Sequence, residues 1–218
     1  MESEDLTQLL NHYLTEMSKI AQQHGATIDK YVGDAIVMFF GDPETRGVKE
    51  DAVACVGMAL AMQARIAELA VTWRDMGIET PLRCRIGIHT GYCTVGNFGS
   101  EDRMDYTMIG SSVNLASRLE RESPAGGILV SFETFALVKD DFICEKQGRV
   151  QVRGISHPVA TYRVLGPRPD SSSTGALTLP VPHMRLEIEP ELISVEERRQ
   201  AAAALRTVLA IIEGPVTQ

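Results

Sequence analysis

The sequence predicts an α+β fold in which helices pack on an antiparallel-rich sheet. Long segments with apolar residues at helical spacing are interrupted by short apolar runs of strand length. Two of these short runs are separated by a tight glycine turn, which is typical of an antiparallel hairpin. The predicted order of elements, α-β-β-α-β followed by α-β and further strands, indicates a sheet covered by helices.

Four segments are predicted to be helical. In the first, leucine, tyrosine, methionine and isoleucine recur every three or four residues, and Gly25 follows as a stop signal. The second carries alanine, methionine, valine and leucine on one face, and the third opens with serines at the capping position. The predicted helices cover residues 4–24, 50–75, 111–122 and 132–137.

The predicted strands are short. The first two form a hairpin whose turn contains Gly33 and Asp34. Three glycines between residues 91 and 99 predict a segment that bends the chain back. The predicted strands cover residues 26–31, 35–40, 83–89 and 128–131, with two more short strands within 151–164.

The chain is predicted to divide into a domain, a linker and an extension. Residues 1–165 contain the elements above and are long enough to bury a core. Residues 166–180 are rich in proline, glycine and serine, which is linker composition. Residues 181–218 contain an alternating stretch and an alanine-rich helical stretch, so we expect a strand-plus-helix extension.

Composition excludes several classes of function. The net charge of −8 argues against a nucleic-acid surface, which needs a cationic stripe, although it leaves a nucleotide substrate open. The four cysteines form no CxxC pair, so we expect reduced thiols in a cytoplasmic protein. We expect no membrane segment in this chain, because no apolar run approaches the ~20 residues that a span needs. The acidic, amphipathic N-terminus is unlike a signal peptide.

A small set of polar residues is placed where it could carry chemistry. Asp34, in the hairpin turn, suits a divalent cation, which prefers oxygen ligands; equally, Gly-Asp is ordinary turn chemistry. Asn114 and Arg118 share a helix face and could grip phosphate or ribose oxygens, or form a solvated polar face. Arg153 is open to the same two interpretations on a strand, and the histidines at positions 24, 89 and 157 are expected to be structural.

Three motifs in order resemble one family. They are Lys30-Tyr-Val-Gly-Asp34, Arg85-Ile-Gly-Ile-His-Thr-Gly91 and Tyr106-Thr-Met-Ile-Gly110-Ser-Ser-Val-Asn114-Leu-Ala-Ser-Arg118. Over roughly residues 3–165 the chain resembles the class III adenylyl and guanylyl cyclase catalytic domain. Within it, the bacterial, bicarbonate-responsive, CyaB-type adenylate cyclases are the most similar subgroup. The resemblance implies a ferredoxin-like catalytic fold.

The resemblance implies a role for each matching residue. Asp34 matches one of two aspartates that bind a pair of Mg²⁺ or Mn²⁺ ions. Lys30 matches the residue that recognises adenine, where guanylyl cyclases carry glutamate, so a guanylate cyclase is disfavoured. Thr107 matches its partner in base recognition and marks the bicarbonate-responsive subgroup.

The remaining matches concern the sugar and the phosphates. Asn114 matches the residue that orients the ribose, and Arg118 matches the arginine that stabilises the pentavalent transition state. Arg153 occupies a phosphate-binding position that is usually lysine, so the charge is kept while the geometry changes. The implied reaction is attack of the ribose 3′ oxygen of ATP on the α-phosphorus, with pyrophosphate leaving.

The same resemblance implies a homodimer, because in this family each active site takes its metal-binding aspartates from one protomer and its Asn-Arg pair from the other. It also implies a first strand, lacking here, that would precede the first helix and supply the other metal aspartate. We therefore expect either a fragment of an adenylate cyclase or, as the alternative, a non-catalytic cyclase-homology module for dimerisation or regulation. The retention of all the matching residues favours the fragment.

Overall fold

The computed structural model describes residues 3–78, 82–151 and 157–168. The chain divides into two compact units, Met1–Arg168 and Pro169–Gln218. The second unit lies outside the described residues, and with it most of the predicted linker and the whole predicted extension 181–218.

Four helices form where the periodicity predicts them. Gly25 follows the first helix in the left-handed conformation, φ 81°, which glycine adopts without strain. Ser131 caps the fourth helix by accepting a hydrogen bond from the backbone N–H of Thr134. The helices are α1 (Ser3–His24), α2 (Val48–Asp75), α3 (Ser111–Glu122) and α4 (Phe132–Val138).

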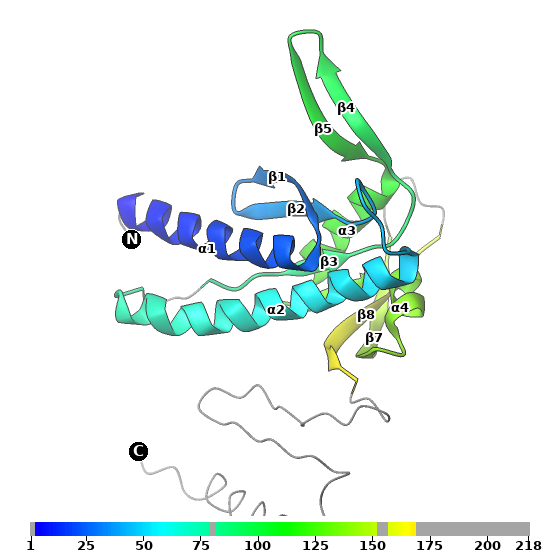
Figure 1. Ribbon diagram of the computed structural model, residues 1–218. Helices are drawn as coiled ribbons and strands as arrows, with labels where there is room; N and C mark the ends of the chain where they lie inside the picture. The colour runs from blue at the N-terminus through cyan, green and yellow to red at the C-terminus, as the bar shows by residue number, and fades with distance from the viewer. Residues whose placement is uncertain (1–2, 79–81, 152–156, 169–218) are drawn as a thin grey trace, which may run out of the picture. The chain divides into compact units, whose positions relative to one another are not determined.

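Within the described residues, eight strands form three sheets (Figure 1). The first and third sheets are the hairpins β1-β2 and β4-β5, and the second has the order β3-β6-β8-β7. Only the β3-β6 pair is parallel, which confirms the antiparallel-rich character. The strands are β1 (Thr27–Val32), β2 (Ala35–Phe39), β3 (Ile86–Ile88), β4 (Thr94–Ser100), β5 (Arg103–Ile109), β6 (Ile128–Ser131), β7 (Phe142–Val150) and β8 (Val159–Pro167).

The prediction of a glycine-rich bend at residues 91–99 is wrong, because most of that segment belongs to β4. The hairpin β4-β5 projects as an arm in Figure 1. Gly99 serves close packing, because a Cβ there would collide with the carbonyl oxygen of Arg103 across the hairpin end. The prediction of two short strands within 151–164 is also inexact, since β7 ends at Val150 and only β8 lies in the described part of that range.

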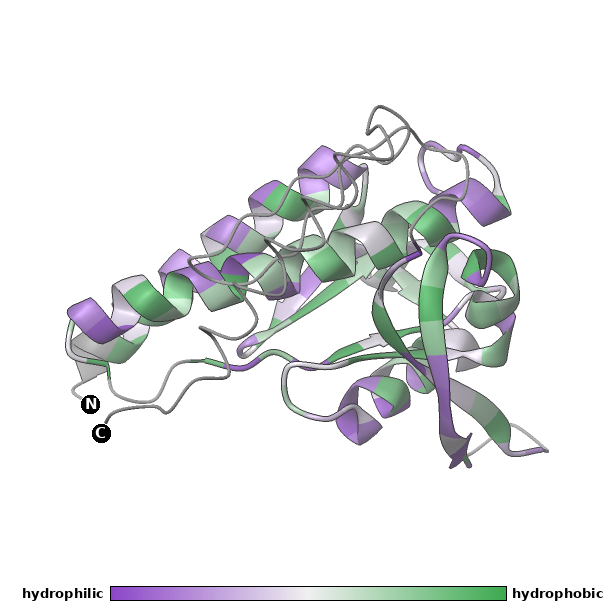
Figure 2. Ribbon diagram, turned by 90° about the horizontal axis from the view of Figure 1, so that it is seen from below, coloured by the Kyte–Doolittle hydropathy of each residue, from purple (hydrophilic) through white to green (hydrophobic). Residues whose placement is uncertain are grey.

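Three apolar clusters form the core of the described residues, and α2 contributes to the first two; the third lies between α3 and strands β6 and β7. The first lies between α1 and α2 and includes Met17 and Trp73, which are 1% and 0% exposed. The second joins α2 to α4 and the four-stranded sheet through residues such as Val56 and Val130. Figure 2 shows apolar residues, in green, recurring along both long helices, whose buried faces contribute to these clusters. The burial of these faces is the main stabilising contribution to the fold.

Helix α2 alone among the described helices meets the length and composition criterion for a membrane span, with mean hydropathy 1.4 over its best window. This is more apolar than the sequence analysis expects. The same helix has eight buried residues that pack into the first two clusters, as the central helix of a folded domain does. Its apolar character is therefore accounted for by the core.

Candidate functional site

Lys30 and Thr107, which belong to separate hairpins, are in direct contact. Nζ of Lys30, on β1, donates a hydrogen bond of 2.8 Å to Oγ1 of Thr107, on β5. Thr107 is 8% exposed, whereas the Lys30 side chain is 49% exposed. The threonine therefore holds the ammonium group at a fixed place while leaving its other donors open to a ligand.

The backbone of β1 is irregular where it presents Lys30. The register with β2 shifts between Ile28 and Lys30, as in a β-bulge. Asp29 sits in this irregularity with its side chain 1% exposed, and its carboxylate lies 3.4 Å from Nζ of Lys30. Neither oxygen of Asp29 has a hydrogen-bond partner among the described residues, so the ammonium of Lys30 is the group that compensates its charge there.

A second contact ties the arm to the first hairpin. The hydroxyl of Tyr106 donates a hydrogen bond to the carboxylate of Asp42, in the loop after β2. That hydrogen bond is the main cause that raises the pKa of Tyr106. Tyr106 and Thr107 are neighbours on β5, so the strand is held to the β1-β2 region at two successive residues.

Asp34 lies in the turn between β1 and β2, after Gly33, whose φ of 64° suits the left-handed turn. It is exposed and makes no hydrogen bond or ion pair with any described residue. Burial is the main reason that the pKa of Tyr13 is raised, and the negative charge of Asp34 adds to it. The carboxylate oxygens of Asp34 are thus available for a cation.

Asn114 and Arg118 lie on the exposed side of α3, while Leu115 and Leu119 form its buried side. Arg118 makes an ion pair of 2.8 Å with Glu122, one turn further along the helix. The side chain of Arg118 is 48% exposed, so this pair contributes little to stability and its guanidinium can exchange partners.

Helix α3 lies directly on β3. A Cβ on Gly87 would collide with backbone atoms of Ala116 and Glu120, so only glycine permits this approach. Within the described residues, no hydrogen bond or ion pair connects α3 with Lys30, Thr107 or Asp34. The structure therefore presents the predicted residues as two separate groups.

Two parts of the predicted site remain: the phosphate-binding Arg153 and the further ligands of the metal ions. Arg153 lies outside the described residues. In the described part of the chain, no group of three or more histidine, cysteine, aspartate or glutamate side chains could hold a metal ion. In that part, Asp34 therefore does not belong to a cluster of three such side chains.

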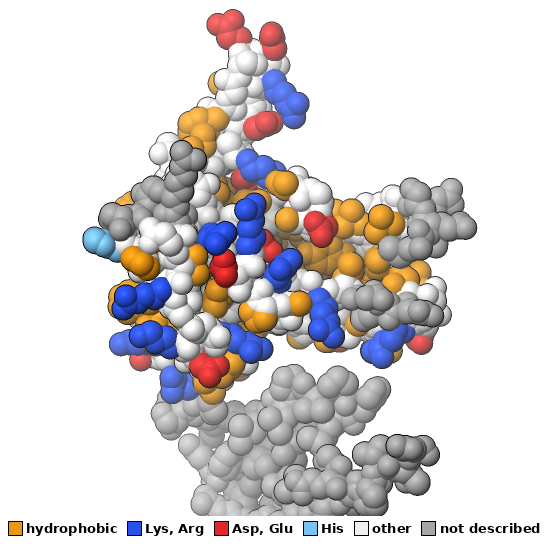
Figure 3. Space-filling view, turned by 180° about the vertical axis from the view of Figure 1, so that it is seen from behind, with side chains coloured by type: hydrophobic (Ala, Val, Ile, Leu, Met, Phe, Trp, Pro, Cys, Tyr) orange, Lys and Arg blue, Asp and Glu red, His pale blue; other side chains and the backbone are white. Residues whose placement is uncertain are grey.

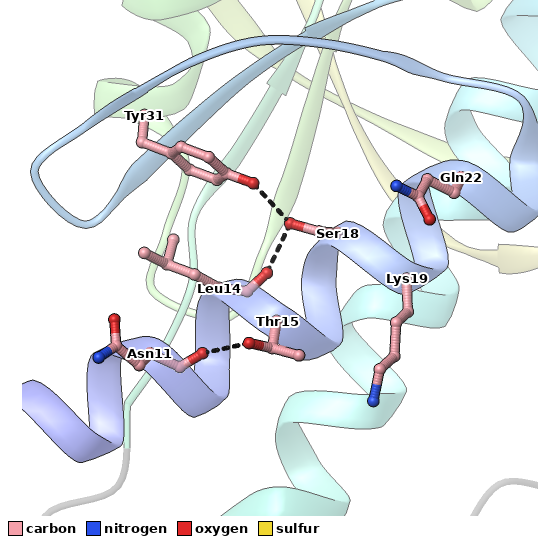
Figure 4. Close-up of a pocket in the computed structure, with 7 residues that line it drawn as sticks. All are labelled: Asn11, Leu14, Thr15, Ser18, Lys19, Gln22 and Tyr31. Atoms are coloured by element: carbon pink, nitrogen blue, oxygen red, sulfur yellow. Dashed lines mark hydrogen bonds between the residues drawn. The ribbon is translucent and has the colours of Figure 1, made fainter.

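A surface hollow of about 410 Å³ lies beside this region, between α1 and β1. Figure 4 shows its lining, in which the hydroxyls of Ser18 and Tyr31 are 2.9 Å apart. Ser18 also donates to the carbonyl oxygen of Leu14, so its hydroxyl is engaged on both sides. Lys30 and Asp34 are not among its lining residues, so the hollow is separate from the predicted site.

Charge is unevenly distributed over the surface. Figure 3 shows lysine and arginine side chains gathered, with a few acidic ones among them, on the face opposite that of Figure 1. The turn at the end of the arm carries Glu101 and Asp102. Although the net charge of the chain is −8, one face offers several cations to an anionic ligand.

Sequence reasoning did not single out Asp29, Asp42 or Tyr106. Each touches a predicted residue or its neighbour only after the hairpins come together. Two sequence signals pointed to two of them: Asp29 directly precedes Lys30, which begins the first motif, and Tyr106 begins the third motif.

Comparison with known proteins identifies the family. The family described as "Adenylate and Guanylate cyclase catalytic domain" matches residues 1–166. Adenylate cyclase 1 of Rhizobium meliloti (strain 1021) is 32% identical over 167 residues, which is 75% of this chain and 24% of that protein. The adenylate cyclase of Mycobacterium tuberculosis (strain ATCC 25618 / H37Rv) is 33% identical over 150 residues, 69% of this chain and 32% of that protein. The chain thus spans less than a third of the length of these two relatives.

Solved structures of cyclases share the fold. The adenylyl cyclase CyaB from P. aeruginosa is 56% identical with a TM-score of 0.75, over 78% of this chain and 87% of that one. The guanylyl cyclase Cya2 is 32% identical with a TM-score of 0.72, over 79% and 86%. The predicted cyclase fold is confirmed by these similarities.

Proposed function

The chain belongs to the adenylate and guanylate cyclase catalytic-domain family, and from this premise we propose that it is an adenylate cyclase domain. It converts ATP to 3′,5′-cyclic AMP and pyrophosphate for intracellular signalling. The observation that carries the proposal is the hydrogen bond of 2.8 Å from Lys30 to Thr107. The greater identity to the adenylyl cyclase CyaB than to the guanylyl cyclase Cya2, 56% against 32%, supports the choice of base.

The Lys30-Thr107 pair favours adenine because of what it can donate and accept. An ammonium group has three donors and no acceptor, so Lys30 can serve an acceptor nitrogen of adenine. It cannot receive the N–H donors of guanine, as a glutamate would. Thr107 orients the ammonium and keeps its own hydroxyl proton for a second contact with the base.

Asn114 and Arg118 serve the sugar and the phosphates. The amide of Asn114 orients the ribose so that its 3′ oxygen lies in line with the α-phosphorus. The guanidinium of Arg118 is exposed and exchangeable, so it meets the negative charge that develops on the phosphoryl oxygens in the transition state. Arg153 would bind the phosphates of the same nucleotide.

A divalent cation, Mg²⁺ or Mn²⁺, would bind at Asp34. The carboxylate of Asp34 has no hydrogen-bond or ion-pair partner among the described residues, and there it belongs to no group of three or more histidine, cysteine, aspartate or glutamate side chains. When bound, such ions lower the pKa of the attacking hydroxyl and neutralise the triphosphate.

The site is completed in a cytoplasmic homodimer. Lys30 and Asp34 belong to one group and Asn114 and Arg118 to another, with no direct hydrogen bond or ion pair between the groups in the described residues. Two protomers related by a two-fold axis would bring the first group of each against the second group of the other. The four cysteines are free thiols, in keeping with a reducing compartment.

The test is cyclic AMP formation from Mn²⁺-ATP by the purified 218-residue chain, followed by mass spectrometry. Asp34→Ala serves as the blank, and chelation by EDTA should abolish the product. GTP in place of ATP should give much less cyclic nucleotide. If this chain is inactive, the same assay is repeated on a chain extended at its N-terminus by an aspartate-bearing apolar strand. Product from neither form would favour the non-catalytic module.

Mixing two inactive variants tests the composite site. Asp34→Ala and Arg118→Ala damage different groups, so a mixed dimer would contain one site with both groups intact. Activity that reappears on mixing supports sites shared between protomers. Two variants that remain inactive when mixed, while each still dimerises, would contradict this arrangement.

A further inference from the structure

We propose that His89 is a positioning residue that holds the first turn of α3, and through it Asn114 and Arg118, at the geometry needed for the reaction. The inference rests on the proposed function. His89 follows β3 directly, and its side chain is 9% exposed. It lies between the beginning of α4 and the beginning of α3, with one ring nitrogen toward each.

The first ring nitrogen is anchored to the core. Nδ1 of His89 lies 2.8 Å from Oγ of Ser131, which is 0% exposed and ends β6. That oxygen already accepts the backbone N–H of Thr134, at 3.4 Å. A hydroxyl can both donate and accept, so this contact ties the imidazole to the end of β6 in either neutral tautomer.

The charge environment agrees with a neutral ring. Burial lowers the pKa of His89, which disfavours the protonated form. The carboxylate of Glu133, on α4, lies 3.7 Å from Nδ1 and opposes this effect. A neutral ring can accept the proton of Ser131, whereas a protonated ring cannot.

The second ring nitrogen faces α3. A Cβ placed on Gly91 would lie 2.6 Å from Nε2 of His89 and 2.6 Å from Oγ of Ser112, so no space is left for even a methyl group. Ser112 donates a hydrogen bond of 2.8 Å to the carbonyl oxygen of Tyr92. The imidazole, the chain at residues 91–92 and the first turn of α3 are thus packed against one another.

The first turn of α3 depends on this support because its own cap is weak. Gly110 is the N-cap and offers no side-chain hydrogen bond to the free N–H groups of the helix. Asn114 and Arg118 follow Ser112 on the same rigid helix. A shift of the first turn would therefore move both functional groups, and small misplacements of such groups reduce reaction rates strongly.

The experiment compares His89→Ala, Ser131→Ala and the double variant with the full 218-residue chain. Each single change should lower kcat about tenfold and leave the KM for ATP within about twofold. The loss of rate in the double variant should be smaller than the product of the two single losses, because both changes remove the His89–Ser131 link, while Ser131→Ala also removes the cap of α4. His89→Asn, which can still place an amide near the position of Nδ1, should recover most of the rate. His157→Gln, at an exposed histidine outside the site, is the matched control.

Amide hydrogen exchange tests the inference without activity. In His89→Ala the amides of α3 from Asn114 onward, the first that have intrahelical acceptors, should exchange at least about tenfold faster, while those of α1 keep their rates. Unchanged exchange in α3, or equal acceleration in α1 and α3, would overturn the inference, as would additive kinetic effects of the two changes. If the parent chain were inactive but exchange in His89→Ala were faster in α3 alone, the result would count against the proposed function. It would still support the role of His89 in holding α3.

Discussion

Nζ of Lys30 donates a 2.8 Å hydrogen bond to Oγ1 of Thr107, across a sequence separation of 77 residues. The two side chains come from different hairpins, β1-β2 and β4-β5. The bond fixes the ammonium group of a half-exposed lysine against a buried threonine. In the proposed function, this pair selects the base. Its energetic and catalytic value can be measured directly.

Thr107→Val keeps the shape of the side chain and removes the acceptor for Lys30. We expect the KM for ATP to rise roughly tenfold, because a hydrogen bond to a charged group contributes about 1.5 kcal/mol or more. The ratio of activities with ATP and GTP should fall, since Lys30 is no longer oriented. Steady-state kinetics with both nucleotides measure this, and Thr94→Val, at an exposed site on β4, is the control. An unchanged ratio would show that Thr107 takes no part in base recognition.

Arg118→Lys keeps a positive charge and loses the planar fork of donors. We expect kcat to fall about 100-fold with little change in the KM for ATP, because the contact is made mainly in the transition state. Arg121→Lys, three residues later on α3, is the matched control and should keep the rate. A large rise in KM at constant kcat would instead assign Arg118 to ground-state binding.

Asp42→Asn should lower the pKa of Tyr106 toward its ordinary value of 10.0. The hydrogen bond to the Asp42 carboxylate stabilises the protonated phenol, so replacing the carboxylate by a neutral amide removes the main cause of the raised pKa. Carbon-13 NMR of labelled tyrosine rings across a pH series measures it. Asp140→Asn, the control, should leave the titration of Tyr106 unchanged. If Tyr106 titrated in Asp42→Asn as it does in the parent chain, the contact between Asp42 and Tyr106 would be contradicted.

Gly87→Ala and Gly57→Ala should have opposite effects on the free energy of unfolding. A Cβ on Gly87 meets the backbone of α3, so we expect a loss of about 1–3 kcal/mol. A Cβ on Gly57 meets nothing within 4 Å inside α2, so alanine should stabilise the chain by about 0.5–1 kcal/mol. Urea unfolding followed by circular dichroism gives both values. Equal effects of the two changes would show that α3 does not lie against β3 as described.

The free energy of unfolding should fall as the pH drops below 6.5, the ordinary pKa of histidine. Burial lowers the pKa of His89 in the folded chain, so the unfolded chain takes up the proton first and is favoured. This destabilisation by His89 is absent above pH 6.5, the ordinary pKa of histidine. It is complete once the pH is below the lowered pKa of His89 in the folded chain. His89→Asn should show a smaller decrease between pH 7.5 and pH 5.5 than the parent, measured by urea unfolding at each pH. Parallel curves for the two chains would argue against a buried, neutral His89.

The sequence by itself determined the helices, the first hairpin and the residue types of most of the candidate site. Helical spacing and a glycine turn are local properties, so α1, α2, α3 and the β1-β2 hairpin could be predicted from short windows. The motifs likewise identified Lys30, Asp34, Asn114 and Arg118 before any contact was known. Strand β4 was mistaken for a bend because Gly99 permits a close approach between strands, which no local pattern records.

The tertiary structure decided which of these residues meet. It joined Lys30 to Thr107, buried Asp29 beside the ammonium group, and placed α3 on β3 through Gly87. It also turned His89, which the sequence analysis expects to be only structural, toward both Ser131 and the first turn of α3. Such contacts depend on the packing of elements that are distant in the chain. The spacing of apolar residues predicts only which face of a helix or strand is buried. Tertiary packing decides which residues of other elements that face contacts.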